Sequence, residues 1–123
     1  MEKAKRFEDL WVWQHARELV KDIYKDFGSG AGSKDFGFRD QVQRAGVSIM
    51  NNIAEGFERG SRREFHRFLS MANASCAQVR AQLYVALDVG YLQPAQFEQL
   101  LASTEELGRI IGGLRLAVAD RAK

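Results

Sequence analysis

The sequence predicts an all-α protein folded as an antiparallel up-down four-helix bundle. Four segments of the 123-residue chain place apolar residues at intervals of three and four, the spacing of one face of an α-helix. No stretch of any length alternates apolar and polar residues as a half-buried strand would, and Pro94 is the single proline. Because the loops between the segments are short, consecutive helices are expected to run antiparallel around one core.

The first predicted helix covers residues 8–27, and a flexible connection is expected to follow it. Its apolar residues recur every three or four positions and so share one face. This face consists of Trp13, Ala16, Val20, Tyr24 (or Ile23) and Phe27. Glycine and serine dominate residues 28–33, a composition typical of flexible linkers.

The next two predicted helices, residues 38–57 and 62–89, are separated by a short turn that contains glycine. The core face of the earlier helix consists of Phe38, Val42, Ala45, Ile49, Ile53 and Gly56. The core face of the later helix consists of Phe65, Phe68, Leu69, Ala72, Cys76, Val79, Leu83 and Ala86. Ser61 followed three residues later by Glu64 predicts a capping box, in which each side chain satisfies a backbone amide of the first turn.

The last predicted helix covers residues 94–119. Pro94 suits the first turn, where its missing N–H costs nothing. Gly90 follows the preceding helix at a position that favours a left-handed backbone. The core face consists of Phe97, Leu100, Leu101, Leu107, Ile110, Ile111, Leu114 and Val118. The four helices therefore form a single domain over residues 1–123.

Composition indicates a cytoplasmic globular protein. Hydrophobic residues make up 46% of the chain, enough for a real core. No apolar segment is long enough to cross a membrane, and residues 1–6 are not followed by the apolar region of a secretory signal. A single cysteine, Cys76, excludes an internal disulfide and fits a reducing compartment. Its place in a helical apolar face predicts a buried, inert thiol.

No catalytic or metal-binding constellation is readable, so the sequence predicts a non-enzymatic protein without a cofactor or metal. His15 and His66 lie on different predicted helices and have no second ligand at metal-binding spacing. The glycine-rich loop that ends in Ser33 and Lys34 lacks the other features of a phosphate-binding loop. An enzymatic alternative rests on Glu55 supported by Asn52, for which no second catalytic group is found.

A row of polar residues follows the edge of the apolar face of the second predicted helix. Successive helical residues turn by about 100°, which places Gln41, Ser48, Asn52 and Glu55 along one edge. Partly buried polar groups need hydrogen-bond partners. We therefore expect a seam of hydrogen bonds between helices that fixes their register.

Trp11 lies two residues before Trp13, so the two indoles cannot share a helical face. With Trp13 in the core, Trp11 is expected to point outward, in line with Phe7. Two interpretations stay open. Either the N-terminal chain folds back over Trp11, or Phe7 and Trp11 form a subunit interface, where aromatic residues concentrate.

The positive charge of the chain is concentrated at the start of the third predicted helix. Residues 59–90 carry five basic and two acidic residues, an excess of +3 in a chain of net charge +2. Helical spacing predicts a solvent-facing basic ridge of Arg59, Arg62, Arg63, His66 and Arg67, extended by Arg39 and Arg44 on the preceding helix. Such a ridge can bind phosphates, and the alternative is a merely solvated face.

Several spaced motifs carry a family resemblance. They are Phe7-x-x-Leu10, Trp13-Gln14-x-Ala16, Asn52-Ile53-Ala54-Glu55-Gly56-x-x-Arg59 and Glu64-Phe65-x-x-Phe68-Leu69-x-x-Ala72. Together they span nearly the whole chain and resemble the four-helix-bundle proteins encoded in 23S rRNA intervening sequences of bacteria. That family also contains a relative, the accessory variability protein of diversity-generating retroelements.

The resemblance implies a compact bundle that assembles into a ring, a homopentamer, and that associates with RNA or a nucleic-acid-handling protein. On this basis the expected function is that of a non-enzymatic, homo-oligomeric bundle that contacts RNA through its basic ridge, without a membrane partner. The alternative is a structural or protein–protein interaction module that binds no nucleic acid.

Overall fold

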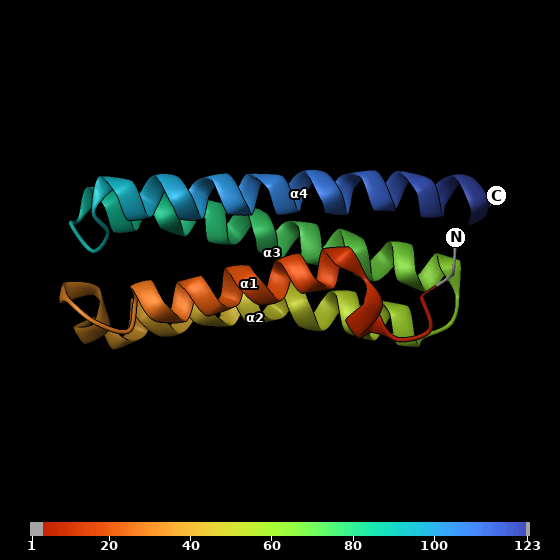
Figure 1. Cartoon of the computed structure of the whole chain (residues 1–123), viewed down its shortest axis with the longest axis horizontal. Coiled ribbons are helices and arrows are strands. Elements are labelled where there is room, and N and C mark those ends of the chain that lie inside the picture. The colour runs from red at the N-terminus through yellow and green to blue at the C-terminus, as the bar shows by residue number, and fades with distance from the viewer. Residues whose placement is uncertain (1–3, 123) are drawn as a thin grey trace.

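Four long helices, accompanied by two short 3₁₀ helices, make up the computed structural model, which describes residues 4–122 (Figure 1). In chain order the elements are η1 (Phe7–Asp9), α1 (Trp11–Asp26), η2 (Ala31–Lys34), α2 (Phe36–Glu58), α3 (Arg62–Asp88) and α4 (Pro94–Ala122). Consecutive long helices run in opposite directions along a common axis (Figure 1). The predicted all-α four-helix bundle is confirmed. Within residues 4–122, no helix has the length and apolar character needed to span a membrane.

The N-terminal helix begins three residues later than the predicted start at residue 8. Leu10 has an extended backbone, with φ −74° and ψ 125°, and so separates η1 from α1. The bend also moves Phe7 out of line with Trp11. The ring of Phe7 packs edge-on against that of Trp13, with centroids 5.1 Å apart.

This folded-back segment changes which face of α1 is buried. The predicted core face was centred on Trp13, but that indole is only half-buried even with Phe7 packed against it, and Tyr24 is exposed. The buried residues of α1 and its C-cap are Val12, Ala16, Leu19, Ile23 and Phe27. Ala16, Phe27 and the alternative Ile23 are buried as predicted, while Val12 and Leu19 take the places of Trp13 and Val20, so the core face of α1 is rotated by about 50° from the prediction.

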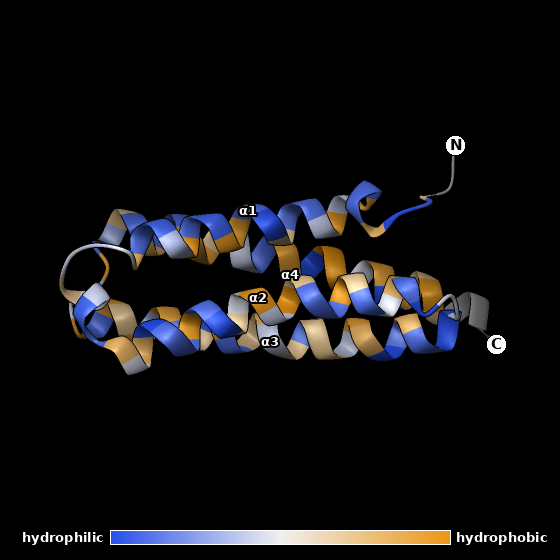
Figure 2. Cartoon of the chain, turned by 90° about the horizontal axis from the view of Figure 1, so that it is seen from below, coloured by the Kyte–Doolittle hydropathy of each residue, from blue (hydrophilic) through white to orange (hydrophobic). Residues whose placement is uncertain are grey.

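Apolar residues of α2, α3 and α4 fill the rest of the core much as their spacing predicts. The fully buried side chains there include Val42, Ile49, Ile53, Leu69, Val79, Leu83, Leu100, Leu107 and Ile111. In Figure 2 the outward edge of α1 is hydrophilic, while hydrophobic segments turn toward the other helices. The bundle thus encloses one continuous hydrophobic core.

One buried polar pair lies between α3 and α4. Thr104, which the apolar spacing did not pick out, is almost fully buried, and its hydroxyl donates to the Leu100 carbonyl at 2.6 Å. The Cys76 thiol donates to the Thr104 carbonyl at 3.2 Å. Burial raises the pKa of Cys76 to about 11, so the thiol stays protonated at neutral pH and is a poor nucleophile.

The connection between α1 and α2 is ordered by packing and is not the flexible linker that its composition predicts. Its η2 turn buries Gly32 against the side chains of Tyr91 and Phe27. The hydroxyl of Tyr91 donates to Oδ2 of Asp35 at 2.7 Å, and Oδ1 of Asp35 accepts from the Phe38 amide at 3.1 Å. This cap extends α2 to Phe36, two residues before the predicted start.

Helices α2 and α3 approach closely near the end of α2. An alanine Cβ at position 56 would lie 2.5 Å from the Cβ of Phe68, so only glycine fits there. Gly60 follows with φ +74°, and the Ser61 hydroxyl accepts from the Glu64 amide at 3.3 Å to start α3. Only this half of the predicted capping box forms, because the Glu64 carboxylate is engaged by arginines.

Replacing Gly56 with alanine should test the close approach of α2 and α3. The Cβ clash is expected to lower the free energy of unfolding by about 1–3 kcal/mol, although alanine favours a helix by about 1 kcal/mol. Gly112→Ala in the interior of α4 is the matched control. Nothing lies within 4 Å of its Cβ position, so stability should rise by up to about 1 kcal/mol. Urea unfolding measures both, and equal stability of Gly56→Ala and wild type would contradict the contact.

Candidate functional site

The predicted basic ridge divides into two separate groups of arginines. Arg39 and Arg44 lie near the start of α2, whereas Arg59 follows its end. At 1.5 Å per residue, Arg44 and Arg59 are about 22 Å apart along the axis. The two arginines of α2 therefore do not extend the ridge. Each also has a local partner: Arg39 donates to the Ser33 carbonyl at 2.9 Å, and Arg44 pairs with Asp40 at 2.9 Å.

Two of the arginines at the α2–α3 turn are held by glutamates. Arg59 pairs with Glu55 at 3.0 Å and with Glu64 at 3.7 Å. Arg67 donates from Nε and Nη2 to the two carboxylate oxygens of Glu64, at 3.0 and 3.1 Å. We call these four residues the arginine–glutamate cluster. Its formal charge is zero, so half of the predicted ridge is neutralised locally.

The same two guanidinium groups cover the ring of Phe68. The Cζ atoms of Arg59 and Arg67 lie 5.0 and 4.7 Å from its centroid, within the range of a cation–π contact. Phe68 is the residue that packs against Gly56. The arginine–glutamate cluster therefore covers the close contact between Gly56 of α2 and Phe68 of α3. This gives Arg59 and Arg67 a structural role.

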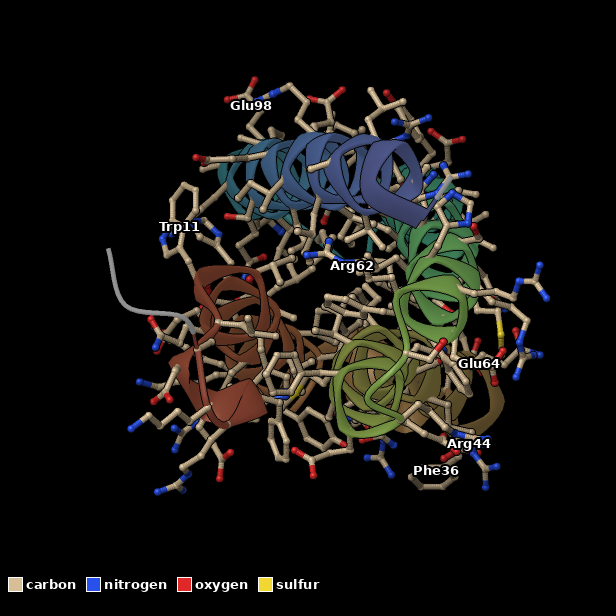
Figure 3. All side chains as sticks on the ribbon, turned by 90° about the vertical axis from the view of Figure 1, so that its right-hand side faces the viewer. Trp11, Phe36, Arg44, Arg62, Glu64 and Glu98 are labelled. Atoms are coloured by element: carbon tan, nitrogen blue, oxygen red, sulfur yellow. The ribbon has the colours of Figure 1, made fainter. Side chains whose placement is uncertain are left out.

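Arg62 and Arg63 differ from their neighbours. Among residues 4–119, whose side chains the structure describes, neither has an ion-pair partner. Both side chains are exposed. Figure 3 shows that Arg62 points toward the middle of the bundle end and not outward with a ridge. Of the arginines in the predicted ridge, Arg62 and Arg63 are thus the two that have no ion-pair partner among these residues. Arg62 differs from the rest of the ridge in pointing toward the bundle end.

The predicted polar seam forms only at its centre. The hydroxyl groups of Ser48 and Ser75 are 2.8 Å apart and join α2 to α3. Asn52 donates to the Ser48 carbonyl at 2.8 Å and to its hydroxyl at 3.1 Å. Ser75 is the partner that sequence reasoning did not identify, and its position on the polar edge of the α3 stripe was the available signal.

The two ends of the predicted seam lie outside it. Gln41 and Glu55 are exposed, so they do not take part in a buried network. Glu55 faces Arg59, whereas Asn52 faces Ser48. Because Glu55 and Asn52 have different partners and line no common pocket among those found in the described chain, the structure offers no support for a catalytic Glu55.

The Trp11 side chain lies on the outer surface of α1. It is 61% exposed and packs edge-on against His15, with ring centroids 5.1 Å apart. Phe7 contacts Trp13 instead, so the expected pair of Phe7 and Trp11 on one outer face is wrong. The N-terminal segment covers Trp13 and leaves Trp11 open. Residues 4–10 therefore do not fold back over Trp11, which was one of the two interpretations left open by the sequence.

Metal-binding side chains do not converge. Among the side chains of residues 4–119, no group of three or more histidine, cysteine, aspartate or glutamate residues is placed to hold an ion. His15 contacts Trp11, and the carbonyl of His66 accepts from the Ser70 hydroxyl at 3.1 Å. Neither imidazole is thereby positioned as part of a metal site.

Comparison with known proteins supplies a family and a fold. A family model described as "23S rRNA-intervening sequence protein" matches residues 8–113. A crystal structure from Bacteroides thetaiotaomicron VPI-5482, described as a protein with unknown function from the S23 ribosomal protein family, is 23% identical in sequence. It matches with a TM-score of 0.77 over 85% of this chain and 97% of its own. No curated protein matches the chain.

Replacing Arg67 with glutamine should raise the pKa of Glu64. The hydrogen bond from Arg67 is the main cause that holds this pKa below its ordinary value, and Arg63 contributes least. Arg63→Gln is thus the matched control and should change the pKa less. A carboxylate with a lowered pKa stabilises the fold above its unfolded pKa, and this stabilisation is lost as the pH falls through the folded pKa.

NMR titration of the Glu64 side chain measures both variants. Urea unfolding at several pH values should also show that wild type loses its advantage over Arg67→Gln as the solution is acidified. Equal Glu64 titration in the two variants would show that Arg67 does not hold the carboxylate.

Proposed function

Because the chain belongs to the 23S rRNA-intervening sequence protein family, we propose that it is a non-enzymatic helical bundle that assembles with copies of itself. We propose a homopentameric ring, the assembly that the family resemblance implies. The protein acts in the cytoplasm in this proposal, since its one cysteine is buried as a free thiol, a state that suits a reducing compartment.

The observation that carries this proposal is the exposed indole of Trp11. Tryptophan is rarely left largely exposed on a monomer and is enriched at the energetic centre of protein interfaces. Trp11, Gln14, His15 and Glu18 also line a shallow hollow of about 180 Å³ on α1. An aromatic anchor beside a small depression is a suitable surface for a second copy of the chain.

The pairing of the arginines favours assembly over RNA binding as the main role. A nucleic-acid surface gains affinity from each cation that neutralises a phosphate. Arg44, Arg59 and Arg67 already neutralise carboxylates of their own chain. A phosphate would have to displace those carboxylates, which reduces what each contact contributes.

RNA contact is the second candidate function, and it rests on Arg62 and Arg63. These adjacent cations begin α3 and have no acidic partner within the described part of the chain. In a ring, each copy would present the same pair, so that weak contacts would add through multivalency. This surface is smaller than the ridge predicted from sequence.

Substituting Trp11 with glutamate should disperse the assembly. A charged side chain cannot be buried in an interface without a partner, so the mass measured by multi-angle light scattering should fall toward that of one chain. Phe36→Glu is the matched control, because Phe36 is 67% exposed on α2 and lies outside the proposed interface. Wild type that is monomeric at high concentration would refute the proposal, and equal dispersal by both variants would remove Trp11 from the interface.

Reversing Arg62 and Arg63 to glutamate should weaken the binding of structured RNA and make it less dependent on salt. The slope of log affinity against log salt should fall by about two, one for each lost phosphate contact. Lys21→Glu with Lys25→Glu on α1 changes the net charge equally and should retain binding. Fluorescence polarisation at two salt concentrations measures this effect. Absence of binding by wild type, or equal loss in both double variants, would contradict an RNA site at Arg62 and Arg63.

A further inference from the structure

The bundle contains an apolar hollow of about 570 Å³ at the end where the α2–α3 turn lies. Its apolar lining includes Leu10, Phe57, Phe65, Leu114 and Val118, which come from all four helices or the residues that flank them. Arg62 is the charged residue of the lining. We call this space the bundle-end hollow. Arg62 also belongs to the proposed RNA site, whereas the other lining residues belong to neither the subunit interface nor the RNA site proposed for this chain.

The hollow exists because the helices differ in length. Helix α1 has 16 residues, whereas α3 has 27 and α4 has 29. At 1.5 Å per residue, α1 is about 24 Å long and α4 about 44 Å. Figure 1 shows α4 continuing past the start of α1 at this end. The fourth wall of the bundle is therefore incomplete, and Phe57, Phe65 and Leu114 are only half-buried.

Arg62 gives this apolar space a single positive charge. Figure 3 shows its side chain directed toward the middle of the bundle end. It has no ion-pair partner among the side chains that the structure describes, residues 4–119, unlike Arg59 and Arg67 at the same turn. A guanidinium at the edge of an apolar space is matched by a ligand with one carboxylate and an apolar body, because arginine binds carboxylates through two parallel hydrogen bonds.

We propose that the bundle-end hollow binds a small amphipathic carboxylate, with its hydrocarbon chain among the half-buried aromatic and aliphatic side chains and its carboxylate on Arg62. The volume matches the 300–1,000 Å³ that is typical of small-molecule sites. The apolar lining with one polar group that fixes orientation is also the usual composition of such sites.

The size of the hollow selects a small molecule over a partner helix. A helix with side chains is about 10–12 Å across and rises 5.4 Å per turn, so each turn occupies roughly 400–600 Å³. A space of about 570 Å³ holds about one turn. A docked helix would therefore leave most of its apolar face outside, whereas a medium-length acyl chain matches the hollow in size.

Calorimetric titration of the full chain with decanoate, below its micellar concentration, tests the proposal. Decanoate should bind, while decyltrimethylammonium and acetate should bind at least about tenfold more weakly, because the first carries a positive charge in place of the carboxylate and the second lacks the apolar chain. Arg62→Gln should weaken decanoate binding by about tenfold. Arg63→Gln, which removes the adjacent charge outside the lining, should leave binding unchanged.

A second pair of measurements locates the ligand. Ala117 is exposed and lines the hollow, so Ala117→Trp should fill the space and abolish binding, with circular dichroism confirming its fold. Should that variant unfold, intermolecular NOEs from decanoate to the rings of Phe57 and Phe65 in the wild-type protein serve instead. The proposal is overturned by absence of decanoate binding, by equal affinity for the cationic or short ligand, or by equal affinity of Arg62→Gln and Arg63→Gln. None of these outcomes depends on oligomeric state or RNA binding.

Discussion

The contact between Gly56 and Phe68 is the constraint on which the arrangement of the α2–α3 junction depends. It allows two long helices to approach closely at the point where the chain reverses, and it places the ring of Phe68 under the guanidinium groups of Arg59 and Arg67. The Ser48–Ser75 hydrogen bond then sets the same pair of helices in register nearer their middle. Close packing at one end and a polar link further along leave little freedom for the two helices to slide.

The same contact explains why part of the local excess of positive charge is engaged within the chain. Arg59 and Arg67 are drawn onto Phe68 and fixed there by Glu55 and Glu64. Their aliphatic stems and charged groups thus protect a core residue at the turn while their charges are balanced. Charge counted along a sequence measures the number of cations, whereas geometry decides how many of them remain available to a partner.

Much of the fold could be predicted from the sequence because it depends on local periodicity. The apolar positions of α2, α3 and α4 recur at helical spacing, and most are buried as that spacing predicts, while Phe38, Phe65, Leu101, Ile110 and Leu114 are half-buried. The face of α1 could not be predicted in the same way, since the extended backbone at Leu10 and the packing of Phe7 on Trp13 are tertiary effects. The ordered η2 turn likewise depends on Tyr91, which lies far away in the sequence.

The candidate site was less predictable for a related reason. Helical spacing shows which arginines can share a face, but it does not show which acidic or aromatic side chains compete for them. Glu64 was expected to complete a capping box and instead binds Arg67, while Arg62 turns toward the bundle end. Which partner each of these side chains contacts depends on the distances between helices. These distances cannot be predicted from any single segment of the sequence.

An even number of antiparallel helices returns the chain to the end from which it started. Ala4 and the last turn of α4 consequently lie beside the α2–α3 turn, with the bundle-end hollow among them, while the loops around η2 and Gly90 occupy the opposite end (Figure 1). The two ends of the roughly cylindrical molecule therefore differ, since only one of them carries the hollow and the termini. A domain or label fused at either terminus would crowd the hollow, and an attachment at the η2 loop would leave it unobstructed.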